Sequence, residues 1–456
     1  MRLTSEGSRM RTTALAALAV LVAVANLAVA EDWSTISIPD SPTIYDMDHE
    51  GGTVWLASHT RGLMGYDDGL WVLHLAEEGG IRTNNYNYTI LVDSSGDKWV
   101  GRDNVNAVDR LDDGGTFFDK SDDTWTYYTY QESLEIRRVF SMAEAPEGGM
   151  WLGQRDESHN NAGTVELLIE NDDSTTDDDQ WYHYDNASTP DSTNFSDDDV
   201  RALATDLSGR LWIGYYASGV DVWDYGNPAV FTDDTWSHYT DLSGLPSNLV
   251  HTLHVAEDGR VWVGTLGGLA VYDPGADSWQ TIDGLPGLQA RAVDTDALGH
   301  VWVGTDEGVA MLYGNGTVAV TYDTDDGLPN ELIRELAVDR VSGTIWVISV
   351  NEGTQATSLS YLETVYGEEM STAFVYPNPW KEGGDVREIT VFGVREGSEV
   401  TIMDLTGQEV RTLEPTQPYV WDTLDDSQNE VPSGVYVIRV EAPEGDVSIA
   451  KAAVIR

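Results

Sequence analysis

The chain of 456 residues carries 78 Asp and Glu against 25 Lys and Arg, a formal net charge of −53, and it has no cysteine. This length is too great for one ordinary hydrophobic core, so we expect two domains, or one repeat domain with an appendage. The acidic surface excludes nucleic acid as a partner, because phosphate binding needs basic groups. The lack of cysteine excludes disulfides, thiolate metal sites and a cysteine nucleophile.

The first 30 residues have the pattern of a secretory signal peptide. Three arginines precede an apolar run from Ala14 to Ala28, and small residues continue to Ala30. An uncleaved membrane anchor is the alternative, but the run is shorter than the ~20 residues that a span requires. We therefore predict that residues 1–30 are removed, that the mature chain has no transmembrane segment, and that the protein is a bacterial one, secreted or at the cell surface.

The acidic residues gather in runs such as "NDDSTTDDDQ" at 171–180. Such runs suit a surface adapted to high ionic strength, where salt screens the self-repulsion. The alternative is that the carboxylates collect Ca²⁺, although no segment fits the spacing of an EF-hand loop. We expect no cofactor and no other metal, with Ca²⁺ as the weaker possibility.

One tryptophan-containing phrase, such as "RVWVG" or "HVWVG", is written seven times along the chain. The repeat is 40 to 61 residues long and consists of short β-type runs between Gly and Asp turns. This period favours four-stranded propeller blades over helical repeats. The repeated tryptophans are Trp55, Trp99, Trp151, Trp212, Trp262, Trp302 and Trp346.

Each copy reads as four strands, except that the seventh copy lacks its last run. The segment 32–37 has the form of that missing run, so we predict that it completes the seventh blade and closes the ring. The fold class predicted is all-β, a seven-bladed β-propeller over residues 31–366 followed by a small Ig-like β-sandwich over 371–456. We interpret the tryptophans as interblade packing. A sugar platform at Trp262 and Trp302 is the alternative.

The wording "DLSGLPSNLVHTLHVAEDGRVWVGTLGGLAVYD" at 241–273 resembles the two-component regulator propeller repeats, as does "DDGLPNELIRELAVDRVSGTIWV" at 325–347. In that family, blades of this kind form extracellular or periplasmic sensor regions that precede a membrane span and a histidine kinase. Nothing after residue 363 resembles a span or a kinase. The resemblance therefore implies the propeller and a general role in ligand recognition, and not the signalling role.

Basic residues recur at the start of the first strand of several repeats. When the repeats are aligned on tryptophan, these residues lie near the channel mouth, where propellers usually bind ligands. Such a basic collar would suit an anionic ligand: a uronate-bearing glycan, a carboxylate or a phosphate. The alternative is that each Arg pairs with an acid such as Asp199 or Glu335. The collar consists of Arg138, Arg201, His251, Arg291 and Arg334, with Tyr45 and Tyr88 in the two remaining blades.

The turns that follow the tryptophan strands differ from blade to blade, and they lie on the same face as the collar. Variation on a repeated frame is typical of a specific site. Tyr215 and Tyr216, with Arg102 and Arg155, could stack on a sugar and clamp it. Ordinary surface turns are the alternative.

Catalytic signatures are sparse in this chain. No G-x-S-x-G, H-E-x-x-H, P-loop or dinucleotide motif occurs. His251 and His254 are three residues apart on one strand, so they point to opposite faces and cannot act together. We predict that the protein is not an enzyme. A propeller enzyme, a lyase or another glycan-active enzyme with its site at the channel mouth, is the runner-up by fold analogy alone.

The last 86 residues alternate apolar and polar residues between Gly and Asp turns, as in "VTIMDLTGQEVRTL" at 400–413. This pattern favours a small antiparallel sandwich. The segment resembles the C-terminal sorting domain of the type IX secretion system and the related Ig-like module of flagellar hook-capping proteins. The first resemblance implies an export or anchoring role and a partner in the export machinery, whereas the second implies a spacer.

Together, these features predict an exported ligand-binding or protein-interaction module. Its partner would be an anionic small molecule, a glycan or another protein. A purely structural surface protein is the third alternative, in which Arg–acid pairs would plug the channel mouth.

Overall fold

The fold is described from a computed structural model. In the N-terminal part it describes residues 33–50, 52–75, 86–102, 107–129, 138–146, 148–155, 164–169, 179–185, 195–197, 199–226, 234–340 and 342–364. In the C-terminal part it describes residues 374–376, 380–381, 389–392, 394, 397–405, 407–413, 419–427, 429–441 and 447–456. The predicted signal peptide, residues 1–30, lies outside the described residues.

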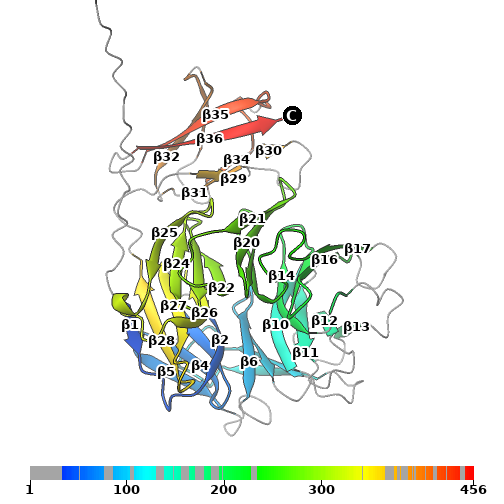
Figure 1. The fold of residues 1–456 in the computed structure, drawn as a ribbon, viewed down its shortest axis with the longest axis vertical. Coiled ribbons are helices and arrows are strands. Elements are labelled where there is room, and N and C mark those ends of the chain that lie inside the picture. Colours follow the sequence, from blue (N-terminus) through cyan, green and yellow to red (C-terminus); the bar gives the residue numbers. More distant parts are fainter. Residues whose placement is uncertain are drawn as a thin grey trace, which may run out of the picture.

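The described residues confirm an all-β propeller built from seven sheets of four strands (Figure 1). Each sheet is one blade, and its strands follow one another antiparallel. Blades one to four comprise β2 (Ile44–Glu50), β3 (Thr53–Ser58), β4 (Gly62–Asp67) and β5 (Leu70–His74); β6 (Asn87–Val92), β7 (Lys98–Arg102), β8 (Ala107–Asp112) and β9 (Thr124–Thr129); β10 (Arg138–Ala145), β11 (Gly149–Arg155), β12 (Thr164–Ile169) and β13 (Gln180–Asp185); and β14 (Val200–Thr205), β15 (Leu211–Tyr215), β16 (Val220–Asp224) and β17 (Thr235–Tyr239).

The remaining blades close the ring. The inner strand of every blade contacts the inner strand of the next, and the last of them contacts β2. A short 3₁₀ turn, η2 (Thr324–Asp326), leads from blade six to blade seven. Blades five to seven comprise β18 (Val250–Val255), β19 (Val261–Thr265), β20 (Gly268–Asp273) and β21 (Ser278–Ile282); β22 (Ala290–Thr295), β23 (Val301–Thr305), β24 (Gly308–Leu312) and β25 (Val318–Tyr322); and β26 (Leu332–Val338), β27 (Thr344–Val350), β28 (Thr357–Glu363) and β1 (Ser34–Ile36).

The outer strand of blade seven comes from the other end of the propeller sequence. Strand β1 pairs antiparallel with β28, with Thr35 opposite Ser360. Trp33, just before β1, is buried beside Tyr322 of blade six. The first and last propeller segments therefore hold one another, and β28 has no open edge.

The repeated tryptophans lie on the second strand of each blade and are buried between blades. Trp262 and Trp302 are 0% and 2% exposed, so neither can be the sugar platform considered from the sequence. The glycine two residues later marks the closest approach of two blades. A Cβ on Gly264 would lie 2.7 Å from the Ala290 carbonyl oxygen of blade six, which is too close for any side chain.

An aspartate in the turn before the tryptophan strand anchors several of these indoles. The indole Nε1 of Trp212 donates to Asp206 at 2.9 Å, and the same bond joins Trp99 to Asp93 and Trp302 to Asp296. In blades three and five this turn position is Ala145 or Ala256. There the buried Nε1 of Trp151 or Trp262 has no hydrogen-bond partner among the described residues.

The C-terminal part forms two small sheets around a separate hydrophobic cluster, which includes Trp380, Ile402, Trp421 and Ile438. It is therefore a small β-sandwich with a core of its own, and the Ig-like topology stays a prediction. Its three-stranded sheet has the order β29 (Phe374–Tyr376), β31 (Ile389–Phe392) and β34 (Tyr419–Trp421); the five-stranded sheet has the order β30 (Trp380–Lys381), β36 (Val447–Ile455), β35 (Gly434–Glu441), β32 (Glu399–Met403) and β33 (Glu409–Leu413).

Candidate ligand-binding site in the central channel

All seven inner strands carry the same irregularity near their first residue. The register between the first and second strands shifts by one residue, so that one residue on the inner strand has no partner opposite it. A β-bulge of this kind re-aims a side chain. The seven bulged residues, which we call the bulge ring, are Tyr45, Tyr88, Phe140, Arg201, His251, Arg291 and Arg334.

The bulge ring corrects one member of the predicted collar. Arg138 does not share the register of the others: it pairs with Arg155 at the very start of β10, and the bulge falls on Phe140 two residues later. The spacing to the repeated tryptophan gives the reason. Phe140 precedes Trp151 by the same number of residues as Arg201 precedes Trp212. Arg138 instead places its guanidinium over the Tyr88 ring, 5.2 Å from the ring centre.

Three consecutive members of the bulge ring are aromatic. The rings of Tyr45 and Tyr88 stack with their centres 4.6 Å apart, and Phe140 follows 5.1 Å from Tyr88. We call Tyr45, Tyr88 and Phe140 the aromatic arc. Tyr86 and His59, stacked at 4.6 Å, extend it outward towards solvent.

The other four members, Arg201, His251, Arg291 and Arg334, form the basic arc, and each of its guanidinium groups has a partner. Arg201 lies 3.0 Å from the Asp199 carboxylate, and its guanidinium stacks on the rings of Phe140 and Tyr216, 5.5 and 4.7 Å from their centres. Arg291 donates to Gln289 Oε1 at 2.9 Å.

Arg334 joins the two arcs. It donates to the Ile44 carbonyl oxygen at 2.6 Å and lies over the Tyr45 ring. Of the two Arg–acid pairs considered from the sequence, the one with Asp199 is present, at Arg201. No ion pair joins Arg334 to Glu335 in the described part of the chain.

Burial and crowding of like charge shape the titration of the basic arc. Burial, together with Arg291 and Arg201, lowers the pKa of His251 to about 4, so its imidazole is neutral at pH 7. Its buried Nε2 has no hydrogen-bond partner among the described side chains. Burial also lowers the pKa of Arg291 and Arg334, but a guanidinium stays charged at any physiological pH.

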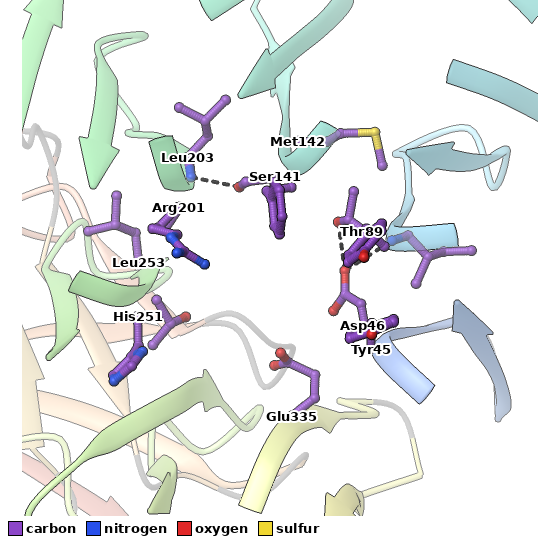
Figure 2. A pocket seen from close by; sticks show the side chains of 15 residues that line it. Tyr45, Asp46, Thr89, Ser141, Met142, Arg201, Leu203, His251, Leu253 and Glu335 are labelled. Atoms are coloured by element: carbon purple, nitrogen blue, oxygen red, sulfur yellow. Dashed lines mark hydrogen bonds between the residues drawn. The ribbon is translucent and has the colours of Figure 1, made fainter. Parts of the chain in front are cut away.

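A cavity of about 380 Å³ lies inside the ring, within the size range of small-ligand pockets (Figure 2). The aromatic arc lines one part of it, and Arg201 and His251 line another. The residue that follows the bulge also lines the cavity in every blade except blade six, as Asp46, Thr89, Ser141, Thr252 and Glu335 do. Arg291 and Arg334 flank the cavity without lining it.

The predicted clamp from the variable turns is not assembled as expected. Tyr215 is fully buried and donates to Asp221 at 2.8 Å, while Arg102 is fully buried and paired with Asp109 at 2.6 Å. Both side chains lie in the interior of a blade, where a buried charge or hydroxyl needs a polar partner, and the two aspartates supply it. Tyr216 is 46% exposed beside Arg201. The side chain of Arg155 lies outside the described residues.

Sequence reasoning missed two kinds of site residue. Phe140 could have been found by counting eleven residues back from Trp151, as for Arg201 from Trp212. Glu335 was considered only as a salt-bridge partner, although its place directly after a bulge turns it into the cavity. In the described part of the chain, no three His, Asp or Glu side chains are grouped so that they could hold a metal ion. Within those same residues, no helix has the length and apolar character needed to cross a membrane.

Comparison with known proteins bears on the fold. The profile of the two component regulator propeller family matches residues 244–267, from the turn after blade four through the first two strands of blade five. No curated protein matches the chain. The family match covers this one segment of the ring of seven blades.

Two solved bacterial structures resemble the chain beyond its propeller. PorZ, a surface component of the type-IX secretion system of Porphyromonas gingivalis, is 19% identical over 93% of this chain and 61% of its own, with a TM-score of 0.55. The extracellular domain of the putative hybrid two component system BT3049 from B. thetaiotaomicron is 16% identical over 93% of this chain and 58% of its own, with a TM-score of 0.57. The chain thus spans about six tenths of the length of each.

A third similar structure covers the propeller alone. The virginiamycin B lyase of Staphylococcus aureus is 14% identical over 73% of this chain and 98% of its own, with a TM-score of 0.51. At these identities, all three similarities establish the fold alone, so the chemistry of the site is argued from the channel residues of this chain.

Proposed function

We propose that the protein is an exported binding module whose propeller holds a small organic anion, or the anionic unit of a glycan, in the channel cavity. The observation that carries this proposal is the bulge ring. One backbone position, repeated seven times, presents the aromatic arc and two members of the basic arc, Arg201 and His251, to the same cavity. A guanidinium binds carboxylate or phosphate, and an aromatic face packs against a sugar or another ring.

The electrostatic setting supports an anionic ligand. The body of the protein repels anions, with a formal net charge of −53. Arg201 lines the cavity while Arg291 and Arg334 stand behind it, so these guanidinium groups set positive charge against the negative charge of the surrounding surface. An anion would therefore find favourable charge inside the ring.

The place of action is part of the same proposal. The predicted signal peptide at residues 1–30 favours export, and the C-terminal sandwich is proposed as the export or anchoring element. The similarity to PorZ and to the BT3049 extracellular domain supports this, because it covers 93% of the chain and so extends past the propeller. A spacer role for the sandwich would leave the protein secreted.

Calorimetry with a matched pair of sugars tests the binding proposal. We expect D-glucuronate to bind and D-glucose, which lacks the carboxylate, to bind at least tenfold more weakly. Arg201→Gln should weaken glucuronate binding about tenfold, or about 1.4 kcal/mol. Arg210→Gln removes the same charge at the other end of blade four, where Arg210 pairs with Asp206, and should leave binding unchanged. Equal weakening by both variants would contradict a site at the ring.

One observation favours the enzyme alternative and can be tested separately. His251 is a neutral imidazole in the cavity, able to accept a proton from a substrate. A lyase would remove the proton next to a uronate carboxylate, break the adjacent C–O bond and form a C=C bond, with the proton returning to the leaving oxygen. Formation of unsaturated chain ends from a polyuronate, lost in His251→Gln, would establish this activity in place of simple binding.

A further inference from the structure

The cavity contains a second pattern, one residue further along each inner strand. Here the seven positions are mostly small or hydroxylic, but blades seven and one place two carboxylates side by side, Glu335 and Asp46. Burial and repulsion from Asp46 raise the pKa of Glu335 well above its usual range. These two acids line the same cavity as Arg201, each one residue after a member of the bulge ring (Figure 2).

The two carboxylates differ in their partners. Asp46 accepts three hydrogen bonds: from the Thr89 hydroxyl at 2.6 Å, the Ile90 amide at 3.0 Å and the Met47 amide at 2.9 Å. Glu335 accepts one bond, from the Leu336 amide at 3.2 Å through Oε1. Its carboxyl group points into the cavity, and no ion pair joins it to a cation in the described residues (Figure 2).

A carboxyl group in this position needs a donor or a positive charge opposite it. Two neighbouring carboxylates that are shielded from water cannot both stay ionised without a cation nearby. Asp46 raises the cost of ionising Glu335, and Asp294 and Asp48 act in the same direction. Arg291 and Arg334 act against it from the bulge ring. A cationic nitrogen brought by a ligand would relieve the repulsion between the carboxylates.

The opposite side of the cavity carries the complementary charge. Arg201 is a guanidinium with five N–H donors, of which Nε faces Asp199. Figure 2 shows Arg201 and Glu335 projecting from different blades into the same space. The cavity thus has a positive side at blade four, a negative side at blades seven and one, and the aromatic arc between them.

We infer that the ligand is a zwitterion, an amino acid or amino-sugar acid type of molecule, whose anionic group faces Arg201 and whose cationic nitrogen lies against Glu335 and Asp46. The aromatic arc packs on the carbon skeleton between the two charges, since a planar ring face suits either a sugar ring or an aliphatic chain. This inference rests on the proposed function and narrows its ligand class.

A set of ω-amino acids with matched acids tests it by calorimetry at neutral pH. The probes are 4-aminobutyrate, 6-aminohexanoate and 8-aminooctanoate, each beside butyrate, hexanoate or octanoate. We expect the best amino acid to bind at least about tenfold tighter than its parent acid. Glu335→Gln should reduce that preference to less than about twofold.

The matched control is Glu331→Gln. Glu331 is exposed in the turn before β26 and accepts a hydrogen bond from the Thr324 hydroxyl. Replacing Glu331 with Gln therefore removes the same charge outside the cavity. This variant should keep the preference. Proton release gives an independent readout: binding of the zwitterion should ionise Glu335 and release up to one proton per ligand, measured as a buffer-dependent heat, and Glu335→Gln should abolish it.

The outcomes separate the two proposals. If the parent acids bind as tightly as the amino acids and Arg201→Gln weakens both, anion binding stands and the zwitterion inference is overturned. If neither acids, amino acids nor glucuronate bind, the proposed function fails with it. A preference that survives Glu335→Gln, with no proton release, would also overturn the inference. Retained thermal unfolding of each variant shows that it is folded.

Discussion

The two ends of an inner strand obey opposite rules. At the end away from the mouth, the turn before the tryptophan strand repeats its backbone, and in three blades it also repeats an aspartate that accepts from the indole six residues later, as Asp206 and Asp296 do. At the mouth, the bulge repeats the backbone alone, and its side chain is Tyr, Phe, Arg or His. The difference teaches that the frame, meaning the repeated backbone with its buried tryptophan, recurs in every blade, whereas a site needs a fixed position with a variable group.

The largest effect is expected at the frame. Trp212→Ala removes a fully buried indole between blades four and five, and we expect it to lower the free energy of unfolding by about 3 to 5 kcal/mol. Tyr88→Ala at the bulge ring should cost less than half of this, because the Tyr88 ring faces the cavity. Urea unfolding of both variants measures the difference. An equal loss of unfolding free energy would show that the bulge ring stabilises the fold as much as the buried tryptophans do.

The next effect concerns pH and separates the two sides of the cavity. The folded pKa of His251, about 4, lies below the unfolded value near 6.5, so the unfolded chain binds more protons between these values and stability falls with falling pH. His251→Gln removes this loss. Between pH 7 and pH 5, we expect it to gain about 1 to 2 kcal/mol of unfolding free energy relative to the wild type.

The acids of blade one act in the opposite direction. Burial raises the pKa of Asp46 and Asp48 to about 6, so the folded chain takes up protons first and stability rises as pH falls from 7 towards 4. Asp48→Asn should remove part of that rise. Thermal unfolding measured from pH 7 to pH 5 compares both variants, and parallel pH profiles for His251→Gln and the wild type would contradict the lowered pKa.

A smaller effect is expected in blade five, where the indole of the repeated tryptophan lacks its aspartate acceptor. Blade five has Ala256 where Asp206 stands in blade four, yet both turns close with the same backbone bonds. Ala256→Asp should supply the acceptor that Trp262 Nε1 lacks and add about 1 kcal/mol to the unfolding free energy. The reverse change, Asp206→Ala, should cost a similar amount. Loss of stability in Ala256→Asp would show that Asp258 already fills this place.

The smallest effect belongs to the variable turns on the mouth face. Leu266 is 40% exposed in the turn between β19 and β20, and the bond that repeats in blade four, from its backbone amide to the Leu249 carbonyl oxygen, does not involve its side chain. Leu266→Ser should change the unfolding free energy by less than about 0.5 kcal/mol. A larger loss in urea unfolding would mean that this turn belongs to the frame.

Much of the fold could be predicted from the sequence because every blade buries a tryptophan at the same position. Seven tryptophans at a period typical of blades predicted seven sheets, and Gly264 predicted the close approach that Ala290 provides. The site was less readable. Aligning basic residues placed Arg138 in the collar, because nothing in the local pattern marks where a strand bulges. Arg102 and Tyr215 gave no sign in sequence that blade interiors would bury them with Asp109 and Asp221.

The sequence by itself determined the repeat, its strands and the residues that fill each blade, because these depend on alternation, turn residues and a tryptophan that every blade must bury. The tertiary structure alone decided which side chains share the channel. Tyr45, Arg201 and Glu335 lie far apart along the chain and in different blades, and they line one cavity because closing the ring brings the starts of seven inner strands together. Charge and pKa followed from that closure, since burial and the nearest charged neighbours set them.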